Sequence, residues 1–96
     1  MGMTAHVRDF RGEILDRGGR DVRELVDAAR RAGLPFLANV DEYDDTVFNR
    51  MQAAVVADEL HELSHRGLGG PIFDEVLQMI GRTQERPHRY LVFNGD

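Results

Sequence analysis

The chain is 96 residues long, carries 17 acidic and 12 basic side chains, and contains no cysteine, which predicts one domain with a single core and excludes disulfides, thiolate metal sites and cysteine nucleophiles. Its formal net charge of −5 argues against general nucleic-acid binding, because that binding depends on neutralising phosphates. No apolar run approaches the roughly 20 residues of a membrane span, and residues 1–10 lack the apolar core of a signal peptide, so we expect a cytoplasmic protein that does not engage a membrane.

Residues 4–17 are predicted to form two short strands around a turn. Apolar and polar side chains alternate from Ala5 to Phe10, which is the period of a half-buried strand. Arg11-Gly12 supplies the turn, residues 13–16 return as the second strand, and Gly18-Gly19 ends the pattern.

Residues 21–32 form the clearest amphipathic helix of the sequence. Asp21 is placed to cap its start, with Glu24 three residues later as in a capping box. Gly33 suits the left-handed residue that ends a helix, and Pro35 prevents continuation. One apolar stripe is expected to face the core, formed by Val22, Leu25, Val26, Ala29 and Ala32.

The second half of the chain is predicted to contain a strand, a loop, two helices and a final strand. Phe36 to Val40 is expected to be a short buried strand, and Asp41 to Asp45 an acidic loop. A long helix should follow from Thr46 to Arg66. Pro71 suits the first turn of another helix, which runs to about Glu85. His88 to Asn94 alternates again and should close the fold as a strand.

The expected element order is therefore β-β-α-β-α-α-β, within the α/β (α+β) class. This order predicts a small four-stranded mixed sheet covered by three helices, in a single domain over residues 1–96. If the strands that flank the first helix are parallel, their crossover should be right-handed. One core is expected to contain Val22, Leu25, Val26, Phe36, Leu60, Val76, Ile80, Leu91 and Phe93.

The segment from His61 to His65 reads H-E-L-S-H and matches the H-E-x-x-H pattern of zinc hydrolases. Both imidazoles would bind Zn²⁺ from one helix face, and Glu62 would act as general base on the bound water. The apolar stripe of this helix runs through Leu60 and Leu63, however, so the two histidines should face solvent. No third ligand is evident, and the alternative is an exposed helix face on which two histidines fall one turn apart.

The loop from Asp41 to Asp45 has four carboxylates in five residues. Asp44, Asp45 or Thr46 is placed to cap the following helix, and the remaining acids favour its positive N-terminal dipole. The carboxylates also suit a hard cation such as Mg²⁺ or Ca²⁺, or a docking patch for a basic protein. The functional hypothesis that we carry forward is partner binding through Asp41, Glu42, Tyr43, Asp44, Asp45, Asn49 and Gln52.

The remaining candidate motifs do not indicate a catalytic or ligand-binding site. The C-terminal strand, with His88 and Tyr90, either completes the sheet or offers an edge for strand addition by a partner. Ser64 is the only serine and lies mid-helix, so no serine–histidine–acid arrangement can be argued. The glycines near residue 70 follow a helix and lack a lysine, which does not fit a phosphate-binding loop. We therefore predict no cofactor.

Two stretches resemble a known group of proteins. The first, from Asp41 to Gln52, reads D-x-Y-x-D-T-x-F-N-x-x-Q, and the second, from His88 to Asp96, reads H-x-Y-L-x-F-x-G-D. Both are similar to motifs of a group of small bacterial proteins of about this length for which no activity is established. The resemblance implies no activity for this chain, but it favours the acidic loop and the following helix start, and the group's pattern does not include H-E-x-x-H. The matching residues of the first motif include Tyr43, Asp45, Thr46, Phe48, Asn49 and Gln52.

These observations predict a small, acidic, non-enzymatic protein-binding domain of the immunity, antitoxin or regulatory accessory type. Two alternatives stay open. One is a minimal zinc metallohydrolase that uses His61, Glu62 and His65, and the other is a structural component of a larger assembly. A protein partner of basic character would complement the acidic loop, and a homodimer is compatible with the sequence.

Overall fold

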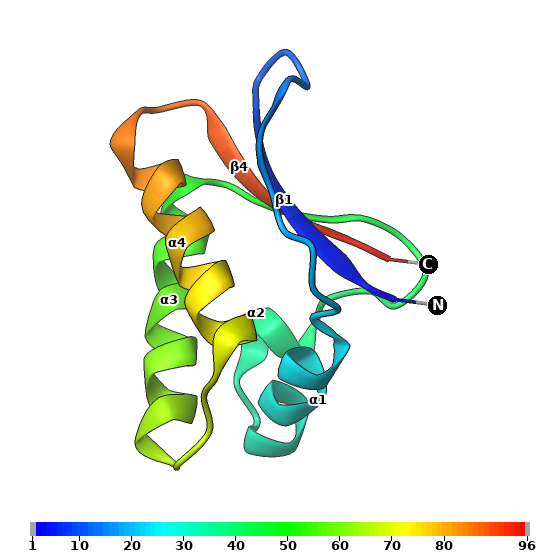
Figure 1. Ribbon diagram of the computed structural model, residues 1–96, viewed down its shortest axis with the longest axis vertical. Helices are drawn as coiled ribbons and strands as arrows, with labels where there is room; N and C mark the ends of the chain where they lie inside the picture. The colour runs from blue at the N-terminus through cyan, green and yellow to red at the C-terminus, as the bar shows by residue number, and fades with distance from the viewer. Residues whose placement is uncertain (1, 96) are drawn as a thin grey trace.

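The computed structural model describes residues 2–95 and orders them as two strands, two helices, a strand, two helices and a strand (Figure 1). The strands are β1 (Thr4–Asp9), β2 (Ile14–Arg17), β3 (Thr46–Phe48) and β4 (Arg89–Asn94). The helices are α1 (Arg23–Ala32), α2 (Pro35–Ala38), α3 (Arg50–His65) and α4 (Pro71–Glu85). None of these helices has the length and apolar character that a bilayer crossing requires.

The strands form one sheet in the order β2-β1-β4-β3, and every neighbouring pair is antiparallel. β1 and β4 are the central strands, with Ala5 opposite Phe93 and Val7 opposite Leu91. The helices lie together on one side of the sheet (Figure 1), and α3 and α4 pack against its strands. The core on the helical side of the sheet contains the buried side chains of Ala5, Val7, Leu91 and Phe93. The opposite face of the sheet is not covered by any element of residues 2–95.

The predicted core is buried, except that Phe36 is half-buried and packs against the core from its rim. Phe48, on the edge strand β3, joins Phe36 to the centre of the sheet. Its ring centroid lies 6.1 Å from that of Phe36 and 5.8 Å from that of Phe93. Aromatic stacking therefore links α2 to β3 and β4.

The expected strand from Phe36 to Val40 is wrong, because Pro35–Ala38 form the short helix α2. A short apolar run fits a strand and a buried helical turn equally well, and two features select the helix. Pro35 occupies the first turn with a backbone already suited to it. The carboxylate of Glu59, on α3, accepts the backbone N–H groups of Phe36 (2.9 Å) and Leu37 (2.8 Å).

The predicted helix from Thr46 is wrong at its start, because residues 46–48 form β3 and α3 begins at Arg50. Asn49 caps α3 reciprocally with Gln52. The Asn49 side chain accepts the Gln52 N–H (2.8 Å), and the Gln52 side chain accepts the Asn49 N–H (2.9 Å). This capping box stands in place of the expected caps at Asp44 to Thr46, and the third strand of the predicted order is formed by residues 46–48.

Three further expectations need correction. The sheet is antiparallel rather than mixed, so no parallel crossover surrounds α1, and residues 2–95 contain four helices rather than three. α1 begins at Arg23, with Val22 as its N-cap and without the capping box expected from Asp21. Asp21 Oδ1 instead accepts the N–H groups of Arg23 (2.9 Å) and Met3 (3.1 Å), which ties the residue before β1 to the start of α1.

Candidate functional site

The H-E-L-S-H segment lies in the last turns of α3, with His61 and His65 exposed as predicted. Leu60 and Leu63 point into the core from the same turns. Glu62 is exposed and its carboxylate lies 3.8 Å from the Nε of Arg66, one turn further along. Within residues 2–95 no three histidine, cysteine or acidic side chains are grouped closely enough to hold a metal ion. The structure therefore brings no third ligand to the two histidines.

Several members of the acidic loop serve the fold of the loop itself. The Asp41 carboxylate accepts the N–H groups of Tyr43 (2.8 Å) and Asp44 (3.2 Å) and so closes a turn, while Thr46 Oγ1 accepts the N–H of Asp41 (2.9 Å). Glu42 forms a 2.8 Å ion pair with Arg30 of α1. These carboxylates have partners within the chain, which reduces the charge that the loop can present to another protein.

Arg30 and the C-terminal tail hold this loop from its two sides. Besides its ion pair with the loop, the Arg30 guanidinium donates to the carbonyl oxygens of Ala38 (3.1 Å) and Val40 (2.6 Å). On the other side, Gly95 packs so closely that a Cβ there would lie 2.8 Å from the carbonyl carbon of Tyr43 and closer still to the backbone of Asp44. Only a glycine fits this contact without movement.

Four residues of the loop, Asp41, Tyr43, Asp44 and Asp45, are exposed, and the Asp44 carboxylate also accepts the Asp45 N–H (2.8 Å). Tyr43 is 79% exposed, and Asp44 and Asp45 are exposed as well. The other predicted site residues, Asn49 and Gln52, bond to each other in the capping box described above. The structure thus brings Tyr43, Asp44 and Asp45 together at the edge of the sheet that β3 forms, beside its uncovered face.

A chain of polar side chains connects the loop to that uncovered face. Asn94 of β4 donates from its amide nitrogen to Asp45 Oδ1 (3.0 Å), and its amide oxygen lies 2.7 Å from Nδ1 of His6 on β1. The acceptor role of this oxygen assigns the ring proton to Nδ1. His6 is only 7% exposed, although it lies on the uncovered face. The network fixes the position of Asp45 relative to the two central strands.

The strand register places a mixed set of side chains on the uncovered face. His6 lies opposite Arg17 of β2 and Val92 of β4, and Val92 lies opposite Val47 of β3. Val92 is fully buried by these neighbours, but Val47 is 42% exposed. We call this surface the open face and define it by the outward-facing residues Arg8, Ile14, Arg17, Val47, Tyr90 and Val92, together with Phe10 of the hairpin tip.

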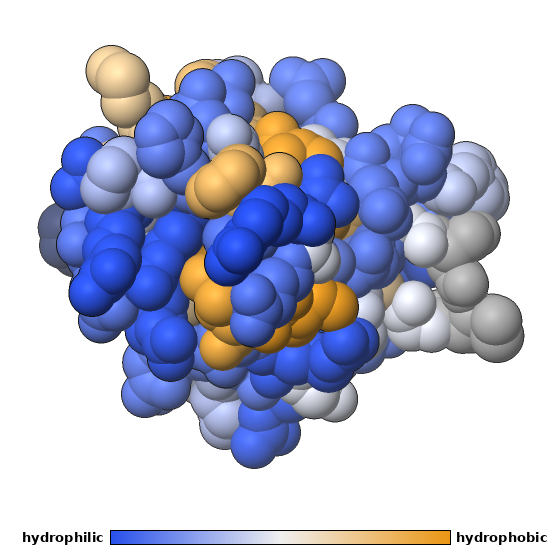
Figure 2. Space-filling model, turned by 90° about the horizontal axis from the view of Figure 1, so that it is seen from above, coloured by the Kyte–Doolittle hydropathy of each residue, from blue (hydrophilic) through white to orange (hydrophobic). Residues whose placement is uncertain are grey.

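The hairpin between β1 and β2 makes part of the open face concave. A hollow of about 420 Å³ extends from the hairpin tip to β3 and is lined by Arg8, Asp9, Phe10, Arg11, Gly12, Val47 and Tyr90. Phe10 is 68% exposed, with the Arg11 guanidinium 5.7 Å from its ring centroid and the His88 ring 5.9 Å away in edge contact. Figure 2 looks down on the end of the molecule that carries the hairpin tip and shows apolar atoms surfacing among hydrophilic side chains.

Two arginines of the open face, Arg8 and Arg17, lack ion-pair partners in the part of the chain that the structure describes, whereas Arg11 of the hairpin tip has two. Arg8 is half-buried and lines the hollow, yet it forms no hydrogen bond or ion pair from its side chain with residues 2–95, and the same is true of the exposed Arg17. Arg11 lies 3.7 Å from both Asp9 and Glu13. An arginine that is partly desolvated without a partner is suited to bind an external acceptor.

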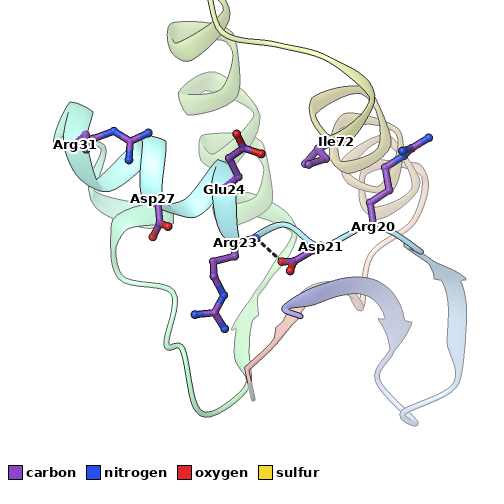
Figure 3. Close-up of a pocket in the computed structure, with 7 residues that line it drawn as sticks. All are labelled: Arg20, Asp21, Arg23, Glu24, Asp27, Arg31 and Ile72. Carbon is purple, nitrogen blue, oxygen red and sulfur yellow. Dashed lines mark hydrogen bonds between the residues drawn. The ribbon is translucent and has the colours of Figure 1, made fainter. Parts of the chain in front are cut away.

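A larger hollow lies elsewhere, along α1 beside the start of α4, with a volume of about 730 Å³ (Figure 3). Its arginines Arg20, Arg23 and Arg31 end at separate places around the hollow, so they offer no common point for an anion. The backbone hydrogen bond from Arg23 lowers the pKa of Asp21 below its ordinary value. A neighbouring hollow of about 260 Å³ is mainly apolar and lies under the loop between α3 and α4. The second hollow also combines polar groups, Glu24 and Arg31, with the exposed Leu68, but its arginine is exposed rather than half-buried.

No family model, curated protein or solved structure matches the chain. The geometry above therefore identifies the open face as the candidate site. Sequence reasoning noticed the alternation of Ala5 and Val7 with His6 and Arg8, but it did not identify the outward set as a site. The signal was present in that alternation, because the residues that face away from the core include a phenylalanine and two arginines within the hairpin. The C-terminal strand, by contrast, completes the sheet at its centre and has no free edge.

Proposed function

We propose that the protein is a small non-enzymatic protein-binding domain, of the type that immunity, antitoxin or regulatory accessory proteins represent, and that its contact surface is the open face. The observation that carries this proposal is the half-buried Arg8, without an ion-pair partner in residues 2–95, in a hollow whose walls include the exposed side chains of Phe10 and Val47. Exposed apolar groups next to unpaired arginines are typical of interfaces rather than of solvated surfaces.

The composition of the open face supports binding to a protein. Aromatic residues and arginine are enriched in interfaces and dominate their binding energy, and Phe10, Tyr90, Arg8 and Arg11 all line the hollow. A four-stranded sheet with one face on a helical layer also leaves its other face free for a second protein. Catalysis has less support, because no nucleophile, base and oxyanion donors converge in the part of the chain that the structure describes.

The acidic loop contributes one side of this surface. Asp44 and Asp45 lie at the β3 edge, whereas Arg8 and Arg17 lie on the β1 and β2 side. A partner would therefore place basic groups against the loop and acidic groups against the arginines. In this proposal the predicted basic partner meets the loop, but the loop forms the rim of the contact and the open face forms its centre.

The test compares two valines of similar exposure that lie on different surfaces of the molecule. Val47 lies on the open face and is 42% exposed, whereas Val55 lies on the outer side of α3 and is 37% exposed. Val47→Asp should abolish capture of a defined partner from a lysate of the native host, and Val55→Asp should leave the capture unchanged. Circular dichroism must show both variants folded. Capture that survives Val47→Asp, or that both variants lose equally, would show that the open face is not the contact surface.

A further inference from the structure

The charges of the open face are separated across its width. Arg17 lies on the edge strand β2, and Arg8 lies on the adjacent strand β1. Asp45 precedes the opposite edge strand β3, and Asn94 holds its carboxylate beside the face. Val47, which is 42% exposed, lies on β3 beside the acidic side, whereas Val92 of β4 is fully buried.

Such a surface is complementary to itself. A two-fold axis that runs along the strands, between two stacked open faces, exchanges the two edges of the sheet. β2 of one copy then faces β3 of the other, so the Arg17 side lies against the Asp45 side twice over. The central strands exchange as well, so Arg8 on β1 faces β4, where Tyr90 presents its ring. Val47 on β3 then faces β2 of the other copy at the level of Arg17, and each contact occurs twice, as an isologous interface requires.

We infer that the occupant of the open face is a second copy of this chain, paired face to face about a two-fold axis along the strands. This inference rests on the proposed function, because it adopts the same contact surface and names the partner. Charge complementarity carries it: a surface with basic groups on one side and acidic groups on the other repels neither side of its own copy in this arrangement.

The size of the face sets the strength of the pairing. Strand spacing of about 4.8 Å and a rise of about 3.4 Å per residue, over strands of 4, 6, 6 and 3 residues, give the sheet a face of roughly 310 Å². That flat area is below the approximately 800 Å² of accessible surface per partner in a stable standard interface. The dimer is therefore of the weak, transient class, and exposed ion pairs make it sensitive to salt.

Sedimentation equilibrium of the full chain provides the first test. The mean mass should rise above 10.9 kDa as the concentration increases from about 10 µM to about 1 mM, and added salt should reduce this rise. A mass that stays monomeric throughout would overturn the inference. The proposed function would still stand if Val47→Asp abolished capture of another protein, and both would fail if capture did not depend on Val47.

A charge swap tests the arrangement itself. Arg17→Glu and Asp45→Arg should each weaken self-association at least about 10-fold, because each places like charges opposite one another twice. An equimolar mixture of the two variants should associate again to within about 3-fold of the unmodified chain, because both contacts between the variants pair opposite charges. Arg31→Glu on α1 and Asp58→Arg on α3 are controls with the same changes of net charge, and both should dimerise normally.

Each result of the charge swap either supports or overturns the face-to-face arrangement. A mixture that fails to associate, or swap variants that behave like their controls, would overturn the face-to-face arrangement. Asp45→Arg also breaks the hydrogen bond with Asn94, so a loss of folding in that variant would be bypassed with Asp44→Arg. Asp44 is exposed in the same loop, and the same restoration in the mixture is expected of it.

Discussion

Replacing Glu59 by glutamine tests how the short helix α2 is held. Glu59 lies on α3 and is 6% exposed, and its two carboxylate oxygens accept the N–H groups of Phe36 and Leu37 at 2.9 and 2.8 Å. Hydrogen bonds to a charged group contribute about 1.5–3 kcal/mol each. Glutamine keeps one acceptor oxygen but turns an NH₂ group toward the second N–H donor, and Leu37 is fully buried, so no water replaces the bond.

The expected loss is therefore about 2–4 kcal/mol in the free energy of unfolding, from one lost charged bond and one unsatisfied buried donor. This is a large share of the 5–15 kcal/mol that is typical of whole domains. Urea denaturation followed by circular dichroism measures it, and hydrogen exchange should show faster exchange at Phe36 and Leu37. Glu62→Gln, on the exposed face of the same helix, is the matched control and should change stability by less than about 0.5 kcal/mol. If Glu59→Gln is as stable as that control, the carboxylate does not hold α2.

Three further predictions concern the acidic loop, the start of α3 and the hydrogen bonds that Asp21 makes to Met3 and Arg23. Gly95→Ala should lower stability by about 1–3 kcal/mol and shift the amide resonances of the acidic loop, because the added Cβ overlaps its backbone. Gly19→Ala, where a Cβ meets nothing within 4 Å, should show neither effect. Asn49→Ala should cost about 0.5–2 kcal/mol through loss of the capping box, and equal stability in denaturation would contradict the assigned cap. The pKa of Asp21 is lowered in the folded chain, first by the Arg23 N–H, so its stabilisation is present above the unfolded pKa of about 3.9 and disappears as pH falls through the lower folded pKa. Urea midpoints measured from neutral to acid pH should therefore fall less steeply in Asp21→Asn, and identical slopes would refute this.

The parts of the fold that depend on local pattern were predictable. The stripe from Val22 to Ala29 forms the buried side of α1, Gly33 ends that helix at a φ of 74°, and His88 to Asn94 contains β4. Each depends on a periodicity or a turn residue within a few positions of the chain. The hairpin also follows from alternation and from Arg11-Gly12, where Gly12 adopts a φ of 87°.

The parts that failed depend on contacts between distant residues. The run from Phe36 to Val40 suits a strand or a helical turn, and the choice is made by Glu59, more than twenty residues away. The start of α3 was misplaced because several residues before it are good caps, and the competition was decided by the reciprocal bond between Asn49 and Gln52. Because α3 begins only at Arg50, Thr46 to Phe48 can pair with β4 as a strand. No pattern within these three residues predicts that pairing.

The candidate site shows the same division between local and distant causes. Sequence reasoning concentrated on the acidic loop because its charges are adjacent in the chain, yet Asp41 and Glu42 are used within the fold. The residues of the open face come from the two ends and the middle of the chain, and Arg8 meets Tyr90 only because β1 and β4 are neighbours.

Strand order decides this outcome. Antiparallel pairing of β1 with β4 puts the outward residues of both strands in one surface, and β3 adds Val47 and the acidic edge. Had β2 paired with β3 instead of β1, Arg17 would lie on the acidic side of the face. The separation of charge across the open face is therefore a property of topology, and it is this separation that makes one copy of the face fit another.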